Sequence, residues 1–210
     1  PSVGVATFPE VLSGAETNAV IAAAEAWKTL RETTQAAQGN CPPRQQMVIQ
    51  PGQSQAWLKQ DGPGKLNLFW FKLHLPPQAG ALDRARLLRE LVLRFYWDGA
   101  KEPRVEAPLG DFFCNGLHGR QFASAGLAFL DNTYICRLPM PFGQAAKAEI
   151  QNDSKWPVQV EVGDDVQSGI ESTRPLNYFH AVWNSSQKQG MPHRIARMEG
   201  RGHYVGCYLV

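Results

Sequence analysis

The stretch LVLRFYWDGAKEPRVEAPLGDFF, residues 91–113, decides the fold because it carries the period and the turn chemistry of a β-hairpin. Apolar residues occupy every second position of its first part, which predicts a strand with one buried face; they are Leu91, Leu93, Phe95 and Trp97. The dipeptide Asp98-Gly99 favours a tight turn, and the chain returns as PRVEAP. Pro108 cannot donate a hydrogen bond to a neighbouring strand and Gly110 frees the backbone, so pairing should end there.

The end of this hairpin is the first candidate for a functional site. We expect Asp111 to be presented at the rim of a sandwich, backed by Phe112 and Phe113. A carboxylate that binds hydroxyl groups, next to aromatic faces that cover a ring, suits a sugar-binding site. The alternative is that Asp111 caps a turn or a helix and that the two phenylalanines belong to the core. The residues alone leave both interpretations open.

The rest of the chain predicts one long helix followed mostly by strands. Apolar positions recur near the helical period from Thr17 to Gln38, and Gly39 stands where a helix cap is expected. Residues 81–91 could form a second, short helix. Strands are expected near residues 45–50, 55–60, 65–75, 90–97, 104–107, 133–138, 145–151, 157–162, 176–183, 193–199 and 203–210. The two prolines of PMPF, residues 139–142, place that segment at an edge or in a loop, with Met140 and Phe142 packed inward.

Short strands at this spacing predict an all-β protein, a jelly-roll β-sandwich with one N-terminal surface helix. We assign residues 1–44 to an N-terminal helical extension and residues 45–210 to the jelly-roll domain.

Composition narrows the classes of function. The chain has 21 Lys and Arg residues against 19 Asp and Glu, a net charge of +2 with no block of like charges, which argues against nucleic acid as a partner. It has no apolar run of the roughly 20 residues that a membrane span requires, so we expect a soluble protein, either cytoplasmic or secreted or periplasmic with its signal removed. The cysteines lack CxxC pairs and the histidines lack the i, i+4 spacing of a helical zinc site, which predicts neither a metal site nor a cofactor.

Four blocks in order resemble glycoside hydrolase family 172. They are LRELVLRFYWDGAKEPRVEAPLGDFFCNGLHG, YICRLPMPFGQAAKAEIQND, NYFHAVWN and GRGHYVGCYL. The resemblance implies a protomer of two jelly rolls, of which this chain would be the N-terminal one, assembled into trimers or larger rings. It also implies retaining hydrolysis of α-D-fructofuranosides or D-arabinofuranosides without a metal.

The catalytic residues of that family do not carry over to this sequence. The family places its two catalytic glutamates in a Glu-Gly-Asp-Glu turn and a Gly-Thr-Glu-Asp-Tyr-Phe loop, and neither motif occurs in the 210 residues. Retaining hydrolysis needs two carboxyl groups roughly 5 Å apart, and Asp111 alone cannot fill both roles. We therefore expect the chain to have no glycosidase activity unless a second unit supplies these residues.

The remaining candidates are substrate contacts rather than catalytic groups. Asp111, Phe112, His118 and His180 are the candidate substrate-binding residues. His118 lies in a glycine-flanked loop that could reach a ligand. His180 lies in an alternating segment with aromatic residues on both sides, so we expect a strand that is covered on both faces; a buried core histidine or a subunit contact is the alternative to a sugar contact.

Two functions from different classes remain open. The chain could be the N-terminal jelly roll of a furanoside-cleaving hydrolase, with a furanoside glycan, further copies of itself and a C-terminal jelly roll as partners. It could also be a non-catalytic jelly-roll module that binds carbohydrate or builds an assembly.

Overall fold

A long N-terminal helix precedes the strands, as the sequence predicts. The computed structural model describes residues 11–40, 45–75, 77–116, 119–170, 177–186, 190, 193–200 and 202–209, and α1 spans Gly14–Asn40. A capping box starts it: the backbone and hydroxyl of Ser13 both donate to the Glu16 carboxylate, at 2.8 and 2.7 Å. Two donors at the helix end are thereby satisfied locally, which explains why the helix begins here.

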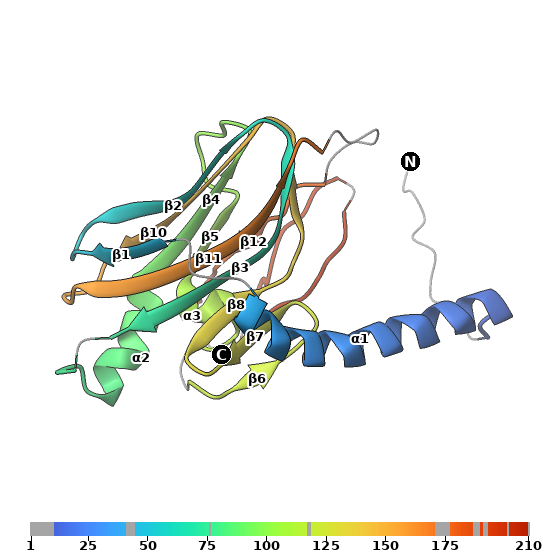
Figure 1. The fold of residues 1–210 in the computed structure, drawn as a ribbon, viewed down its shortest axis with the longest axis horizontal. Helices are drawn as coiled ribbons and strands as arrows, with labels where there is room; N and C mark the ends of the chain where they lie inside the picture. Colours follow the sequence, from blue (N-terminus) through green and yellow to red (C-terminus); the bar gives the residue numbers. More distant parts are fainter. Residues whose placement is uncertain are drawn as a thin grey trace.

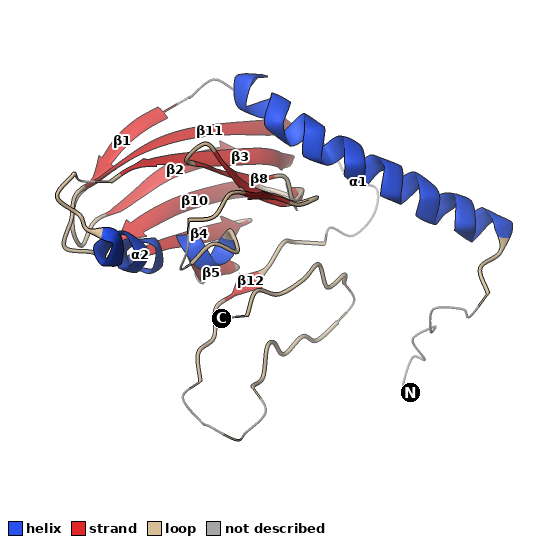
Figure 2. Ribbon diagram, turned by 90° about the horizontal axis from the view of Figure 1, so that it is seen from below, coloured by secondary structure: helices blue, strands red, loops and turns tan. Residues whose placement is uncertain are grey.

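The N-terminal part of α1 projects from the rest of the molecule. Its C-terminal end lies beside the strands, whereas its N-terminal end points away from them (Figures 1 and 2). Every side chain described within α1 is exposed, including the apolar Val20 and Ile21. The surface position of the helix is confirmed, and this part of it buries no apolar face.

Two packed sheets form the β-sandwich, which confirms the predicted all-β class. Sheet A has the order β1-β11-β3-β8-β7-β6, with β9 also paired to β3. Its strands are β1 (Gln45–Ile49), β3 (Gly64–His74), β6 (Phe122–Ala123), β7 (Leu127–Leu130), β8 (Thr133–Cys136), β9 (Met140–Phe142) and β11 (Val158–Ser168). Sheet B has the order β12-β5-β4-β10-β2, formed by β2 (Ser54–Asp61), β4 (Leu91–Trp97), β5 (Val105–Pro108), β10 (Ala145–Asn152) and β12 (Ala181–Val182).

The chain changes sheet repeatedly, as in a jelly roll. It runs from β1 in sheet A to β2 in sheet B, returns to β3 and crosses again to β4. Nearly all pairs are antiparallel; β12 pairs with β5 in parallel. Two short helices complete the described elements: α2 (Ala81–Glu90), as predicted, and α3 (Leu109–Phe112) directly after β5.

The hairpin of β4 and β5 forms as its sequence predicts. The four alternating apolar side chains of β4 are buried, and Asp98 and Gly99 both have positive φ, 54° and 70°. The amide of Ala100 donates to the carbonyl of Trp97 at 3.0 Å and closes the turn. Pairing reaches Pro108 and stops there.

The interior between the sheets is rich in aromatic rings. Phe69 lies at its centre, with ring centroids 5.3 Å from Trp57, 5.4 Å from Phe95 and 6.0 Å from Phe112. A β-bulge in β2 contributes to it, because the register between β10 and β2 skips Trp57 and both Trp57 and Leu58 are buried. The PMPF segment behaves as predicted: among the described strands β9 pairs with β3 alone, and Met140 and Phe142 are fully buried.

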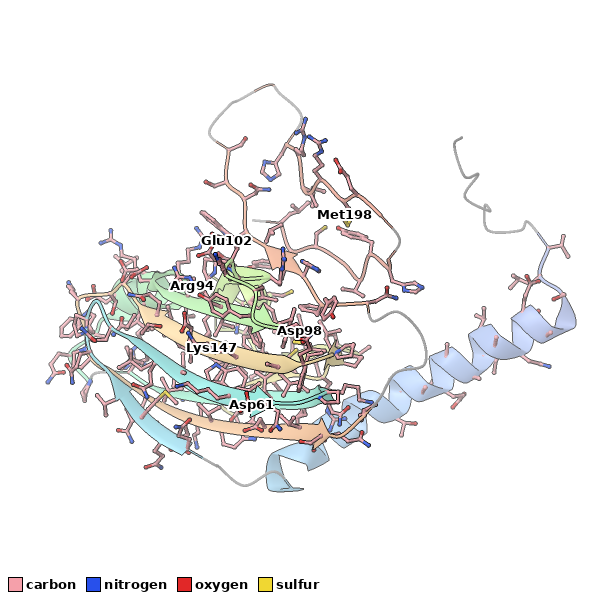
Figure 3. All side chains as sticks on the ribbon, turned by 90° about the horizontal axis from the view of Figure 1, so that it is seen from above. Asp61, Arg94, Asp98, Glu102, Lys147 and Met198 are labelled. Atoms are coloured by element: carbon pink, nitrogen blue, oxygen red, sulfur yellow. The ribbon has the colours of Figure 1, made fainter. Side chains whose placement is uncertain are left out.

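The C-terminal part departs from the predicted strands. Residues 193–199 and the described residues of 203–210 form no strand, and the strand expected over 176–183 contracts to β12. Met198 marks a segment that extends away from the sandwich (Figure 3). The alternating pattern there is typical of a strand, but a strand also needs a neighbour to pair with, and the described residues provide none for this segment.

Candidate functional site

The turn after β5, residues 109–116, is the best-supported candidate site and is called the Asp111 loop below. Pro108 ends the pairing, α3 makes one helical turn, and Cys114 ends that turn with a φ of 54°. Two hydrogen bonds close it: Asn115 N to Gly110 O at 2.7 Å and Cys114 N to Asp111 O at 3.0 Å. This is the Schellman pattern, in which glycine usually holds the left-handed position. Cysteine there costs roughly 1–2 kcal/mol of backbone strain.

The carboxylate of Asp111 is buried and faces α2, so the expectation that it is presented at the rim of the sandwich is wrong. Asp111 is 8% exposed, and Arg89, in the last turn of α2, approaches both of its oxygens at 3.5 Å. These contacts form a long ion pair. Within the described part of the chain, Oδ2 of Asp111 and Nδ2 of Asn115 are buried without a hydrogen-bond partner. The same turn therefore holds a buried acceptor and a buried donor, neither of which has a hydrogen-bond partner among the described residues.

Two glycines allow the backbone to approach this carboxylate. A Cβ on Gly116 would lie 2.0 Å from Oδ1 of Asp111, and a Cβ on Gly110 would lie 2.9 Å from Cβ of Leu88. Side chains at either position would move the loop. The geometry at Asp111 thus requires glycine at positions 110 and 116 for reasons of space.

Phe112 lies in the core beneath the loop. It is 9% exposed, its ring stacks on Phe95 at 6.2 Å between centroids, and it meets the edges of Phe113 and Phe179. Its ring therefore packs against the interior instead of covering a sugar at the surface. Phe113 is fully buried. Both phenylalanines therefore belong to the core, which is the second of the two interpretations that the sequence left open.

A comparison with models of known protein families finds a match that includes the Asp111 loop. A family model described as GH172 domain-like matches residues 40–163, more than half of the chain and all of the Asp111 loop. The chain belongs to the GH172 domain-like family. No curated protein matches it significantly. The GH172 membership relates the chain to glycoside hydrolases. The match begins at the last residue of α1, and it ends before the segment that contains β12.

His180 lies outside the GH172 match and outside the regular strands. It is exposed, and its pKa is lowered first by partial burial and then by the charge of Arg104. The expectation of a strand covered on both faces is wrong, because Phe179 and Ala181 pack against the core while Val182 and Trp183 are exposed. His118 lies outside the described residues.

Asp98 accepts hydrogen bonds from distant parts of the chain, although the sequence indicated only a turn residue at this position. Its carboxylate accepts hydrogen bonds from three backbone amides, of Gly143, Gln144 and Ala145, at 3.0, 2.6 and 3.1 Å. The hydroxyl of Tyr178 donates to it as well, at 2.5 Å. Burial raises the pKa of Asp98, but these donors lower it by more, so the net shift is downward. This carboxylate joins three separate segments of the chain.

The outer face of sheet B carries a network of charges. Arg94 contacts Glu106 at 2.8 Å, and Glu149 accepts from Tyr96 at 3.0 Å and pairs with Lys147 at 2.6 Å; Arg94 and Lys147 are marked in Figure 3. Burial raises the pKa of Glu149, but its partners lower it by more. A glycosidase acid needs a raised pKa, so Glu149 in this setting is an ion-pair partner and is unsuited to that role.

No three His, Cys, Asp or Glu side chains among the described residues are grouped to hold a metal ion. No helix in the part of the chain that the structure describes has the length and apolar character needed to cross a membrane.

Proposed function

We propose that the chain is part of a retaining glycoside hydrolase that acts on α-D-fructofuranosides or D-arabinofuranosides, and that it forms a wall of the substrate site. The observation that carries this proposal is the GH172 domain-like match, which includes the Asp111 loop. In this role Asp111 and Asn115 hold a sugar hydroxyl, the carboxylate accepting a hydrogen bond and the amide donating one.

The catalytic carboxylates come from outside these 210 residues in this proposal. Retaining hydrolysis uses a nucleophile and an acid/base roughly 5 Å apart, and the sequence contains neither of the two motifs that carry them in the resembling family. Asp111 is paired with the cation Arg89, which suits a binding group.

Partners for the chain are part of the proposal. Large apolar side chains remain exposed in β12 and along the described residues that follow it: Val182, Trp183, Ile195, Met198, Tyr204, Val205 and Leu209. Such a concentration of apolar surface is typical of an interface. We assign it to a second jelly roll, in an assembly of several copies.

The second candidate function is a non-catalytic jelly-roll module that binds carbohydrate. It is favoured by the sequence itself, since neither of the two motifs that carry the catalytic glutamates of glycoside hydrolase family 172 occurs in the 210 residues.

Two assays on the full chain test the proposal. The first follows sugar release from p-nitrophenyl α-D-arabinofuranoside, and we expect none. The second measures binding of methyl α-D-arabinofuranoside by saturation-transfer NMR. We expect binding that Asp111→Asn and Asn115→Ala abolish and that Asp131→Asn, at an exposed turn, leaves intact. Release of pentose by the chain alone, or equal binding by folded Asp111→Asn, would contradict it.

A further inference from the structure

The residues that lead into β12 are attached to the β4–β5 hairpin; residues 178–182 are called the 178–182 segment below. The hydroxyl of Tyr178 donates to Oδ2 of Asp98 in the hairpin turn at 2.5 Å, and Asp98 is marked in Figure 3. The indole N–H of Trp97 donates to the carbonyl of Phe179 at 2.8 Å. The segment ends in β12, which pairs with β5. The hairpin therefore holds this segment at its start and at its end.

The ring of Phe179 contacts the Asp111 loop. It meets the ring of Phe112 edge-on, with 6.4 Å between the centroids and an angle of 72° between the planes. The other rings around Phe112 are Phe69 and Phe95, which lie in β3 and β4, and Phe113, which lies in the loop itself. Within the described residues, the contact with Phe179 is therefore the ring contact that joins the loop to a segment outside the regular strands.

A displacement of Phe112 would move the carboxylate of Asp111. The two residues are consecutive in α3, which makes a single helical turn, so the ring and the carboxylate move together. Arg89 approaches the carboxylate oxygens at 3.5 Å, which is already long for a hydrogen bond. The amide of Asn115 closes the same turn on the carbonyl of Gly110 at 2.7 Å. The arrangement of the polar groups in the loop thus depends on where this turn is held.

The hydrogen bond of Tyr178 fixes the 178–182 segment and is not needed to join the sheets. Tyr178 is 38% exposed, so its ring contributes little to the core. Asp98 already accepts the backbone amides of residues 143–145, which join the hairpin turn to the start of β10. The hydroxyl of Tyr178 adds a contact to the residue next to Phe179, and this contact acts on the ring that meets the loop.

We propose that Tyr178 is a positioning residue for the Asp111 loop. Its hydrogen bond to Asp98 keeps Phe179 against Phe112, and this ring contact keeps the carboxylate of the loop in its place. The proposal rests on the proposed function where it takes a sugar hydroxyl as the ligand of the loop, whereas the position of the loop is measured without any ligand.

Two tyrosine variants of the full chain form a matched pair, Tyr178→Phe and Tyr96→Phe. Tyr96 lies in β4 and donates to the carboxylate of Glu149 at 3.0 Å on the outer face of sheet B. Its replacement removes the same kind of hydrogen bond from the same hairpin and leaves the 178–182 segment attached. The two variants should therefore lose similar overall stability, and a difference between them in the loop is local.

Hydrogen exchange of the amides of Cys114 and Asn115 is the first measurement, because their hydrogen bonds close the loop. We expect Tyr178→Phe to speed exchange of these two amides about fivefold more than Tyr96→Phe does. Equal exchange in the two variants would overturn the proposal, since Tyr178 would then act on stability alone.

A third variant tests whether the effect passes through the ring of Phe179. Phe179→Ala leaves the tyrosine hydroxyl in place but removes the contact with Phe112, so it should also speed exchange in the loop. The double variant of Tyr178→Phe and Phe179→Ala should match Phe179→Ala alone, because both changes act through one contact. The indole N–H resonance of Trp97, assigned with Trp97→Phe, should shift in Tyr178→Phe, since its acceptor is the carbonyl of Phe179. Additive effects in the double variant would contradict this route.

Binding of methyl α-D-arabinofuranoside separates this proposal from the proposed function. Tyr178→Phe should weaken binding about threefold or more, and Tyr96→Phe should leave it unchanged. Unchanged binding in Tyr178→Phe, with a wild-type chain that binds, would overturn the positioning role. A wild-type chain that binds no furanoside would contradict the proposed function alone, and loop exchange would still decide the role of Tyr178.

Discussion

Replacing Asp98 by asparagine should destabilise the sandwich by about 2 kcal/mol. Oδ1 of Asp98 accepts all three amide hydrogen bonds, from Gly143, Gln144 and Ala145, and an asparagine oxygen can occupy the same place. A hydrogen bond to a charged acceptor stabilises the fold by roughly 0.5–1 kcal/mol more than one to a neutral acceptor, and each of the three bonds loses this difference. Asparagine also tolerates the positive φ of 54° at this position, so backbone strain does not contribute.

The measurement is urea or thermal unfolding of the wild-type and variant chains. A loss of about 2 kcal/mol corresponds to a fall in Tm of about 4–8 °C for a domain of this size. Asp131→Asn is the control, since Asp131 also occupies the first central position of a two-residue hairpin turn with positive φ. Its carboxylate is exposed and accepts no hydrogen bond from the described residues. We expect this variant to stay within about 0.5 kcal/mol of wild type.

The effect should depend on pH in a defined direction. The pKa of Asp98 is lowered below its ordinary 3.8, because the Tyr178 hydroxyl and the three amides outweigh burial, which raises it. A lowered pKa in the folded state gives stability that is present above the unfolded pKa and is lost as the pH falls through the folded pKa. The difference between wild type and Asp98→Asn should therefore be full above about pH 5 and shrink below about pH 4. An unchanged stability at pH 7, or a loss that persists at low pH, would refute this account.

Three further outcomes follow from the packing. Tyr178→Phe removes one donor from the same carboxylate and should cost about 1 kcal/mol while increasing hydrogen exchange in the segment after it, measured by mass spectrometry. Gly163→Ala should destabilise by more than about 2 kcal/mol in urea unfolding, since a Cβ would lie 2.2 Å from Nε1 of Trp70. Burial raises the pKa of Cys136 to about 12, so thiol-specific labelling at pH 8 should modify the exposed Cys207 and spare Cys136 until the chain unfolds.

Controls for these three use the same chain. Gly80→Ala should be near neutral, because a Cβ there meets nothing within 4 Å and the φ of −68° suits alanine. Equal destabilisation by both glycine variants would contradict the steric argument. Labelling of Cys136 in the native state at the rate of Cys207 would contradict its burial, and unchanged exchange after Tyr178→Phe would show that Asp98 does not hold that segment.

Elements set by neighbouring residues could be predicted from the sequence. The β4–β5 hairpin, the helix α2 and the position of PMPF each depend on period, turn residues or proline chemistry within a few positions. The β7–β8 hairpin was missed although its signal was present, since Asp131 and Asn132 stand between two apolar runs and both adopt positive φ, 46° and 64°.

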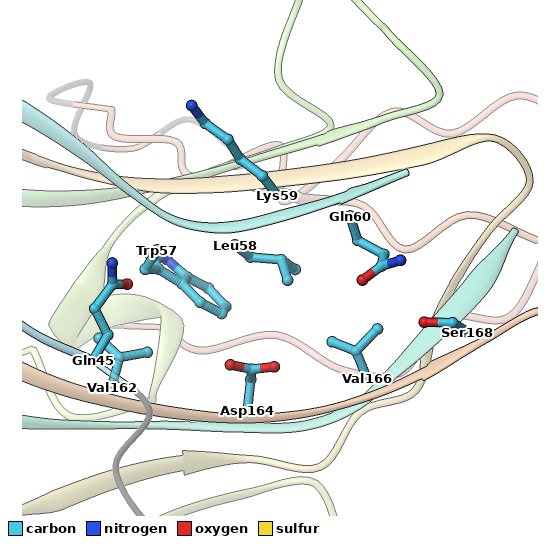
Figure 4. A pocket seen from close by; sticks show the side chains of 9 residues that line it. All are labelled: Gln45, Trp57, Leu58, Lys59, Gln60, Val162, Asp164, Val166 and Ser168. Carbon is cyan, nitrogen blue, oxygen red and sulfur yellow. The ribbon is translucent and has the colours of Figure 1, made fainter. Parts of the chain in front are cut away.

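Features set by distant residues could not be predicted. The donors to Asp98 come from positions 45 to 47 residues away and, for Tyr178, 80 residues away. No local pattern reports such partners. The cavity between β2 and β11 (Figure 4) likewise depends on the bulge at Trp57, which shifts β2 against β10, and on where β1 stops pairing with β11. Residues 193–199 and 203–210 have the alternating pattern of a strand, but a strand forms only beside another strand, and the pattern does not say whether such a neighbour exists.

The Asp111 loop shows how one helical turn decides between two interpretations of the same residues. An extended chain would place Asp111 and Phe113 on one face and Phe112 on the other. In α3 and its cap, Leu109, Phe112 and Phe113 instead follow an i, i+3, i+4 spacing and share a face, and all three are buried. Asp111 falls off that face and meets Arg89. A ligand of this loop would therefore meet the Asp111 carboxylate with its ion-pair partner Arg89 and the amide of Asn115, without an aromatic platform from either phenylalanine.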